Sequence, residues 1–236
     1  MTAEVESSGA VGEKASPPQA ARRDSMMLLA RRPLLGALAA GLLAAPARAA
    51  TDPARAAAFI EATGGQLVAA INDTRSDVAT RRNRVAAVLR QAVDTEGVGR
   101  FILGRWWRQA TPAEQAEYLR LFDETLTRNL SARFGDYQGV RFSVGRLQQR
   151  TEDDVLVNTV IERPNSAPYS LDWRVADVGG QPKIVDLIAE GTSLRLTQRS
   201  EYSAVIQRSG NSIGALLTAM QGQIAALSVR ETSGAR

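Results

Sequence analysis

The sequence has no cysteine and no histidine among its 236 residues. The absence of cysteine excludes disulfide bonds, thiol nucleophiles and cysteine-ligated zinc, and the absence of histidine excludes catalytic triads that depend on imidazole. A proton shuttle near neutral pH would need a carboxylate, lysine or tyrosine with a shifted pKa. The lack of cysteine leaves the compartment open, because an exported domain of this size can fold on its hydrophobic core alone.

A concentrated stretch of positive charge is also missing. The 29 basic and 25 acidic residues leave a formal net charge of +4, and residues 1–49 carry six of the basic and four of the acidic residues. The rest of the chain is therefore close to neutral, with its arginines scattered. Because a nucleic-acid-binding protein would show a clustered basic stripe, we expect no nucleic-acid partner.

The N-terminus has the pattern of an extension followed by an export signal. Residues 1–25 are rich in Ala, Ser, Pro and charged residues, as in unstructured segments. Arg31–Arg32 then precede an apolar stretch, Pro33–Ala45, and Ala47–Ala49 fits a small-x-small cleavage site. A membrane anchor is the alternative, but this stretch is shorter than the roughly 20 residues of a membrane-spanning helix. We predict cleavage near Ala49–Ala50 and no stable insertion into the membrane.

Two features of this signal stay open. The twin arginines weakly resemble a Tat signal, and an ordinary Sec signal explains them equally well. Translation from Met26 or Met27 would give a signal of normal length, so the true start codon is undecided.

Helical spacing dominates the first half of the remaining chain. Asp52-Pro53 has the pattern of an N-cap followed by a first-turn proline, and Thr111, Pro112 and Glu114 have the pattern of a capping box. Apolar residues recur every three or four positions after these starts. The spacing predicts helices over about 53–71, 77–93, 95–109 and 112–134, with Gly64-Gly65 expected to loosen the first.

From about residue 138 the apolar period changes to two, which is typical of strands. Short polar connections between these segments favour an antiparallel meander. The pattern predicts four strands over 140–145, 154–162, 169–175 and 183–189, and two more helices over about 194–208 and 212–227.

This order of elements predicts one α+β domain over residues 50–227, with a curved sheet covered on one face by helices. Residues 228–236 are expected to form a flexible tail. Apolar residues cover about two-thirds of the circumference of the predicted helix 95–109, by the 100° step per residue. A surface helix has a narrower apolar stripe, so we expect helices 95–109 and 112–134 to pack on that face.

Few groups in the sequence could carry chemistry. Asp153-Asp154 falls in a predicted turn, and Asp172 with Arg174 is expected to form an exposed cross-strand pair. Asp186 lies between apolar residues, which could raise its pKa and make it a general base. Glycine pairs lack the spacing of a phosphate-binding loop. We therefore predict no catalytic residue, no metal site and no cofactor.

Two motifs occur in order. Ile102–Leu126 carries an apolar-Leu-Gly-x-aromatic-aromatic stretch followed by Ala-Thr-Pro, and Val185–Gly210 carries Ile-Ala-Glu-Gly-x-Ser followed by Glu-aromatic and Arg-x-Gly. In these motifs the chain resembles the bacterial periplasmic phospholipid-binding proteins of the Mla pathway, the MlaC or toluene-tolerance family. The resemblance covers nearly the whole mature chain. The chain departs from the pattern at Thr192, where Val is frequent, and at Trp106-Trp107, where tyrosines are commoner.

The resemblance implies an NTF2-like cone with an apolar pocket between sheet and helices. It implies a monomeric periplasmic carrier that takes diacyl phospholipid between an outer-membrane lipoprotein complex and an inner-membrane MCE-protein/ABC transporter. A hopanoid-associated branch of the same family leaves the cargo open. Head-group preference and direction of transport are also open.

A carrier of this kind needs apolar walls rather than reactive groups. Each buried methylene contributes about 0.8 kcal/mol, so two acyl chains in water are disfavoured by an order of 20 kcal/mol. The residues expected to line the pocket are Phe101, Leu103, Trp106, Phe122, Leu126, Leu130, Phe134, Val157, Thr159, Ile161, Leu171, Trp173, Ile188 and Thr192. The alternatives are a solid core at these positions, an enzyme that uses Asp186 or Asp172 as a base, and a chaperone for envelope proteins.

Overall fold

The structure is a computed structural model that describes residues 51–135 and 138–233, without the side chains of 133–135 and 230–233. The N-terminal extension, the export signal and its cleavage site, predicted over residues 1–50, lie outside the described residues. All the described helices and strands belong to one folded unit.

The described residues form six α-helices and one 3₁₀ helix. Two helix starts match the sequence patterns: Asp52 accepts a hydrogen bond from Ala54 N at 3.0 Å, and Thr111 and Glu114 exchange the bonds of a capping box. The Thr111 N–H holds the pKa of the Glu114 carboxyl below its ordinary value. The helices are α1 (Pro53–Ile71), α2 (Val78–Ala92), α3 (Thr95–Leu103), η1 (Gly104–Arg108), α4 (Pro112–Gly135), α5 (Leu194–Arg208) and α6 (Ile213–Ser233).

Two helix boundaries differ from the prediction. The predicted helix 95–109 ends as an α-helix at Leu103, because Gly104 has φ +58° and the chain continues as η1. A Cβ on Gly104 would also lie 2.9 Å from an Arg199 nitrogen. The last helix continues to Ser233, past the predicted end at residue 227. Arginine and glutamate favour helix, so the polar composition after residue 227 does not require the helix to end there.

The sheet is antiparallel, with strand order β1-β2-β3-β4-β5. It confirms the predicted meander, but it adds a fifth strand of two residues, and its first strand runs on to Thr151 through a polar stretch without alternating apolar residues. The strands are β1 (Arg141–Thr151), β2 (Asp154–Glu162), β3 (Tyr169–Val178), β4 (Gln181–Ala189) and β5 (Thr192–Ser193).

The register of the central strands places their apolar residues on one face. Val157 pairs with Trp173 and Thr159 with Leu171, and Val155, Val157 and Thr159 are fully buried. The Trp173 indole Nε1 donates a hydrogen bond to Thr159 Oγ1 at 2.8 Å. The polar atoms on this face therefore have partners within the sheet, which leaves the face apolar.

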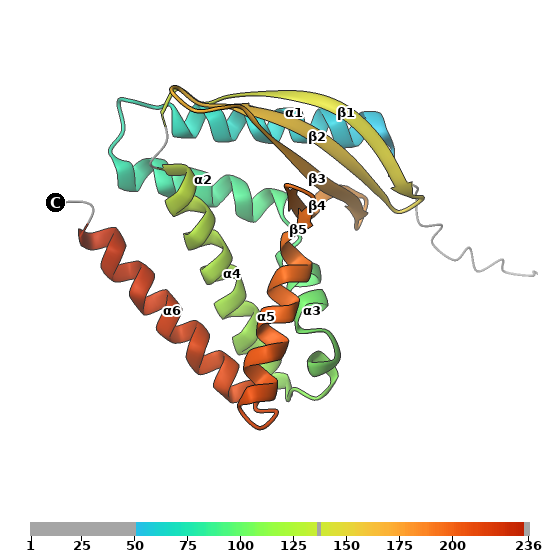
Figure 1. The fold of residues 1–236 in the computed structure, drawn as a ribbon, viewed down its shortest axis with the longest axis vertical. Helices are drawn as coiled ribbons and strands as arrows, with labels where there is room; N and C mark the ends of the chain where they lie inside the picture. Colours follow the sequence, from blue (N-terminus) through green and yellow to red (C-terminus); the bar gives the residue numbers. More distant parts are fainter. Residues whose placement is uncertain (1–50, 136–137, 234–236) are drawn as a thin grey trace, which may run out of the picture. The chain divides into compact units, whose positions relative to one another are not determined.

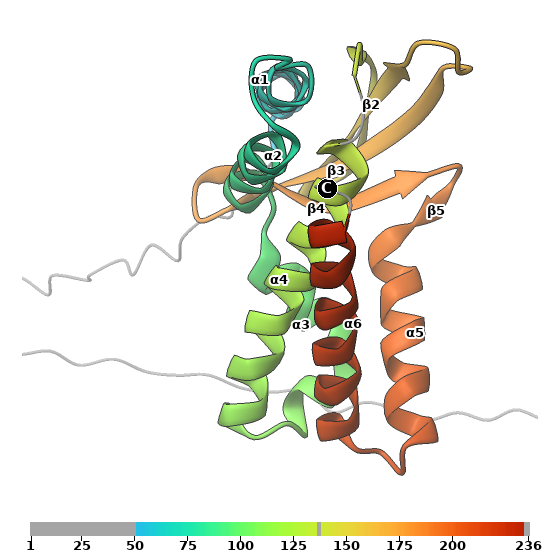
Figure 2. The same ribbon diagram turned by 90° about the vertical axis from the view of Figure 1, so that its left-hand side faces the viewer.

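The helices divide into two groups around the sheet (Figures 1 and 2). Helix α1 lies along β1 to β3, with α2 beside it. Helices α3, α4, α5 and α6 form a bundle, which meets the sheet mainly at β4 and β5 and joins the first group where α4 packs against α2. The expectation that helices 95–109 and 112–134 together cover the sheet is therefore wrong: α3 meets the sheet at β4, and α4 packs against α2 and the other bundle helices.

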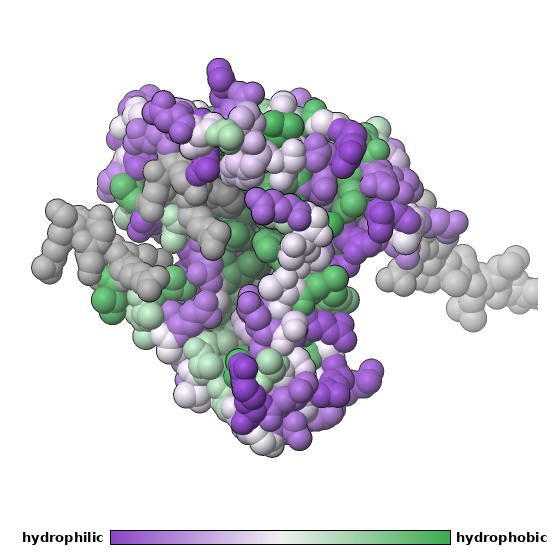
Figure 3. Space-filling view, in the orientation of Figure 1, coloured by the Kyte–Doolittle hydropathy of each residue, from purple (hydrophilic) through white to green (hydrophobic). Residues whose placement is uncertain are grey.

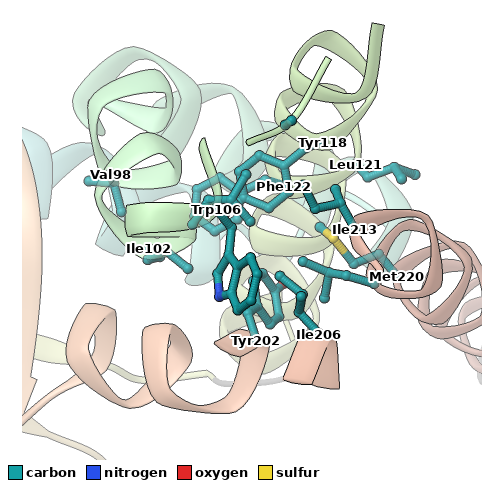
Figure 4. Close-up of a cluster of buried hydrophobic side chains, with 13 residues drawn as sticks. Val98, Ile102, Trp106, Tyr118, Leu121, Phe122, Tyr202, Ile206, Ile213 and Met220 are labelled. Carbon is teal, nitrogen blue, oxygen red and sulfur yellow. The ribbon is translucent and has the colours of Figure 1, made fainter. Parts of the chain in front are cut away.

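The bundle has its own core, in which side chains from four helices meet (Figure 4). Tyr118 stacks on Phe122 with ring centroids 5.9 Å apart and meets the edge of Tyr202 at 6.3 Å. Burial raises the pKa of the Tyr118 phenol far above its ordinary value, and its hydroxyl donates to Gly99 O at 3.0 Å. Trp106 belongs to this core and donates to Ser203 Oγ at 3.3 Å.

Hydrophilic residues cover most of the face seen in Figure 3, and apolar residues gather in a recess between the upper layer and the helices below. The distal part of α6 also carries apolar residues at the surface, where Val229 is 64% exposed. No described helix is long and apolar enough to cross a membrane.

Candidate functional site

A narrow apolar slot lies between α1 and the inner face of the sheet. It encloses a cavity of about 50 Å³, and the unfilled space is about 600 Å³ when its open mouth is included. The slot is lined by Ile60, Thr63, Gly64, Leu67, Val68, Ile71, Val140, Phe142, Ile161, Arg163, Tyr169, Leu171, Trp173 and Ile184.

Helix α1 contributes one stripe of residues to the slot. Positions three or four apart share a face of a helix, so Ile60, Gly64, Leu67 and Ile71 stand in one row. At 1.5 Å per residue this row is about 16 Å long. The slot is therefore elongated along α1.

One end of the slot is closed and apolar. Ile60, Trp173 and Ile184 line it and are 2%, 9% and 4% exposed. The indole N–H of Trp173 is used by Thr159, so no unsatisfied polar atom of this residue points into the end. A group bound here would contact hydrocarbon and aromatic surface alone.

The side of the slot formed by β1 is closed by a single aromatic ring. A Cβ on Gly64 would lie 2.2 Å from Phe142 Cζ. Glycine in a helix interior costs about 0.5–1 kcal/mol relative to alanine, so its presence here needs a reason. The reason is the close approach of the Phe142 ring, which fills the space that a side chain at position 64 would take.

The other end of the slot is polar. Arg163 follows β2 and lines the slot beside Tyr169, with its guanidinium 5.2 Å from the centre of the Tyr169 ring. Asn72 at the end of α1 bonds both backbone groups of Val140, its Nδ2 donating at 2.8 Å and its Oδ1 accepting at 3.0 Å. The end of α1, the start of β1 and Arg163 therefore meet at this end.

The structure brings three of the fourteen predicted pocket residues to the slot: Ile161, Leu171 and Trp173. Val157 and Thr159 lie on the same face of the sheet and are fully buried beside Trp173.

Most of the other predicted residues lie in or against the bundle core. Leu103, Trp106 and Phe122 are buried there. Phe101 and Leu126 pack against it, and the Arg195 and Arg199 guanidiniums lie 4.4 and 5.0 Å from the Phe101 ring centre.

Three predicted residues lie elsewhere, and a fourth is not described. Leu130 packs on the core that joins α1 and α2. Ile188 lies on the outer face of the sheet beside Asp172, because β4 is shifted by a bulge, and Thr192 is exposed in β5. The Phe134 side chain falls outside the described atoms.

Sequence reasoning missed the whole contribution of α1, together with Phe142, Arg163 and Tyr169. A signal was present: Gly64-Gly65 interrupts an otherwise strong helix, which indicates a close approach of another element. The apolar stripe of α1 resembled an ordinary core stripe, so it did not distinguish a slot from a filled interior.

The two carboxylates considered as bases have structural partners. Asp186 is 1% exposed and forms an ion pair with Arg195 at 3.3 Å. It also accepts bonds from Ser193 Oγ at 2.5 Å and from the N–H groups of Leu187 and Arg195 at 2.9 and 3.1 Å. The contacts with Ser193 and Arg195 tie β4 to the start of α5, and burial lowers the pKa of the Arg195 guanidinium. Asp186 therefore holds the sheet to the bundle and does not line the slot.

Asp172 and Arg174 each pair across to β2, not with each other, and both are half-buried rather than exposed as expected. Asp172 accepts a bond from Asn158 Nδ2 at 2.7 Å, and Arg174 pairs with Asp154 at 3.1 Å. Both contacts are cross-strand, as predicted: Asn158 is directly opposite Asp172, and Asp154 is the diagonal neighbour of Arg174. Among the described residues no group of three or more acidic side chains could hold a metal ion.

Comparison with known proteins places this slot in a family context. Residues 61–222 match the family model described as MlaC protein. The toluene tolerance protein Ttg2D of Pseudomonas putida is 23% identical over 143 residues, which cover 58% of this chain and only 65% of that protein. A phospholipid-binding protein from Ralstonia solanacearum, solved in complex with a phospholipid, has a TM-score of 0.66 at 21% identity, covering 73% of this chain and 98% of that one. This likeness confirms the predicted α+β fold.

Proposed function

The chain belongs to the MlaC family, and we propose from this premise that it is a periplasmic carrier that holds phospholipid acyl chains in the slot between α1 and the sheet. The observation that carries the proposal is the slot itself, which is elongated, apolar at its closed end and charged at the other. The solved relative with this fold was determined with a phospholipid, which supports the same class of ligand.

The physical need for such a slot follows from the cost of acyl chains in water. At about 0.8 kcal/mol per methylene, a two-chain lipid loses on the order of 20 kcal/mol when it leaves a membrane for water. An apolar cavity that covers the chains removes most of this cost without any reactive group. The slot provides hydrocarbon walls, while the carboxylates of Asp172 and Asp186 are engaged elsewhere. We therefore propose a carrier without catalytic activity.

Lipid binding requires the slot to widen. One water molecule needs about 10–15 Å³ of cavity volume, so the enclosed 50 Å³ corresponds to a few waters, well short of two acyl chains. Among the described helices, α1 makes the main contacts with β1 to β3, and the Phe142 ring meets it at a glycine. The widening that we propose is a separation of α1 from β1 with rotation of the Phe142 ring, which lies against Gly64 of α1.

The carrier is proposed to exchange its lipid with an outer-membrane lipoprotein complex and an inner-membrane MCE-protein/ABC transporter. Support for these partners comes from membership of the family and from the similarity to the toluene tolerance protein Ttg2D. A hopanoid cargo is an outcome that the experiment below distinguishes.

The test is mass spectrometry of lipid extracted from the purified protein, combined with transfer of labelled phospholipid from liposomes. Val68 lines the slot and is half-buried, so Val68→Trp should fill its mouth and remove most of the bound lipid. Val205→Trp is the matched control, since Val205 is half-buried against the bundle core. A wild-type protein without lipid and without transfer would contradict the proposal, as would equal lipid content in the two variants.

A further inference from the structure

The slot has one charged residue among its fourteen lining residues, Arg163. We propose that Arg163 binds the phosphodiester group of the lipid and thereby makes the slot selective for phospholipids over uncharged lipids with the same chains. This inference rests on the proposed carrier function and adds to it a residue that recognises the head group.

The position of Arg163 relative to the closed end fits an acyl chain. Arg141 pairs with Glu162, so Val140 and Arg163 are the next residues beyond this pair. The close approach of Gly139 to Pro164, where a Cβ would lie 2.8 Å from Pro164 Cγ, shows that the two segments stay together there. Asn72, which follows the last residue of α1, bonds Val140. Arg163 therefore lies at the end of the slot opposite Ile60.

The distance between the two ends has the scale of one lipid leaflet. The α1 row is about 16 Å long, and the hydrocarbon core of a bilayer is about 30 Å thick, or roughly 15 Å per leaflet. A chain whose methyl end lies against Ile60 and Trp173 would thus have its polar end beside Arg163. An uncharged residue at this point would be enough for hydrocarbon, whereas a guanidinium can also donate hydrogen bonds to phosphate oxygens.

The surroundings hold the guanidinium in place at the mouth. Its centre lies 5.2 Å from the Tyr169 ring, within the range of a cation–π interaction. The turn after it is tight, with Asn165 at φ +58° and a bond from Ser166 N to Arg163 O at 3.4 Å. The neighbouring acidic residue Glu162 is already paired with Arg141 at 3.2 Å, so its charge is compensated.

The chemistry of the side chain favours phosphate. Guanidinium is planar and always charged, and its N–H groups can donate two parallel bonds to two phosphate oxygens. It is also more weakly hydrated than an ammonium group, so less is lost when it lies beside apolar walls. Lysine at the same position would keep the charge but lose the paired geometry and the contact with the Tyr169 face.

The test is a competition within one vesicle. The full-length purified protein is incubated with liposomes that contain dioleoyl-phosphatidylglycerol and dioleoylglycerol in equal amounts, and the two lipids bound to the protein are quantified by mass spectrometry. Wild-type protein should favour phosphatidylglycerol. Arg163→Gln should lower the bound ratio by about tenfold, which is ~1.4 kcal/mol, and Arg163→Lys should lower it less.

The matched control is Arg150→Gln, which removes the same charge from the opposite end of β1, where Arg150 is exposed. The ratio does not depend on the fraction of folded protein, so a loss of stability cannot imitate the effect. An unchanged ratio in Arg163→Gln, with both lipids bound, would overturn this inference and leave the carrier function standing. Failure of the wild-type protein to take up either lipid would overturn both.

Discussion

The bundle core and the slot are both apolar, yet one is filled and the other is not. In the bundle, α3 to α6 surround a core whose Tyr118, Leu121 and Ile206 are at most 1% exposed. At the slot, a single helix lies on a curved sheet, and the lining includes half-buried residues such as Val68 and Phe142. An apolar face on a helix or strand therefore predicts only that another element packs on it. Whether the space between them is completely filled depends on how many elements pack together there.

The largest expected effect contrasts one leucine in each region. Leu103→Ala removes a side chain that is 1% exposed in the bundle core and should lower the free energy of unfolding by roughly 3–5 kcal/mol, since the transfer and cavity terms add. Leu67→Ala, in the slot, should cost about 2 kcal/mol, close to the transfer term alone, because space already lies beside it. Urea denaturation measures both. Equal losses would break the distinction between filled core and slot.

The second prediction concerns the joint between the regions. Asp186→Asn weakens the buried contacts that tie β4 to α5 and should cost about 3 kcal/mol, because the Arg195 charge stays partly buried without its partner. Asp172→Asn is the control and should stay within about 0.5 kcal/mol, as for most surface substitutions. Lipid bound per folded molecule should not change in either variant. If folded Asp186→Asn bound less lipid than the wild type, Asp186 would have a role in lipid binding, which would contradict a purely structural role.

The third prediction sharpens the view that Phe142 closes the slot. Gly64→Ala should lower stability by about 1 kcal/mol, since the added methyl group displaces the ring. In a Phe142→Ala background the same change should raise stability by about 0.5–1 kcal/mol, as alanine does in an open helix.

Gly65→Ala is the control for this cycle, because no atom lies within 4 Å of a Cβ built there. It should be stabilising in both backgrounds when thermal unfolding is measured. If Gly64→Ala had the same sign with and without Phe142, the ring would not be the contact that closes the slot.

The smallest expected effect is a decrease in the stability of the fold at acidic pH, with contributions from both regions. Hydrogen bonds from Ser76 and Arg75, with Arg84 nearby, lower the pKa of Asp73 from 3.8 to about 2, next to the end of α1. In the bundle, Arg120 lowers the pKa of Glu117 from 4.5 to about 2. A carboxylate whose pKa is lowered in the folded state stabilises the protein when the pH is above the pKa of the unfolded state. This stabilisation is lost as the pH falls through the pKa of the folded state.

We therefore expect stability to fall between about pH 5 and pH 2. Asp73→Asn and Glu117→Gln should each flatten this fall slightly, because their partners Arg84 and Arg120 are exposed and solvent weakens these interactions. Unfolding midpoints across this pH range provide the measurement. A steeper fall in either variant would contradict the assigned direction of its pKa shift.

Local patterns could be predicted with good success, as particular residues show. The capping box at Thr111 and Glu114 starts α4 as expected, and the alternation of Val155, Val157 and Thr159 places them on the buried face. These features depend on neighbours within a few residues. The broad apolar surface around Trp106 correctly indicated burial on several sides, but the partners of Trp106 lie about 100 residues away, in α5.

The order of helices and strands, the apolar faces, the exclusion of cysteine and histidine chemistry, and the resemblance to a family could all be read from the amino-acid sequence. These follow from composition and short-range spacing, which the chain carries in any conformation. The packing of the folded chain established that α1 lies along the sheet and that the aromatic residues of α3 and α4 pack in the bundle core. It also placed Arg163 at the open end of the slot. The physical reason is that apolar surface is non-directional: it favours burial against any apolar partner, and the choice of partner depends on how all the elements pack at once.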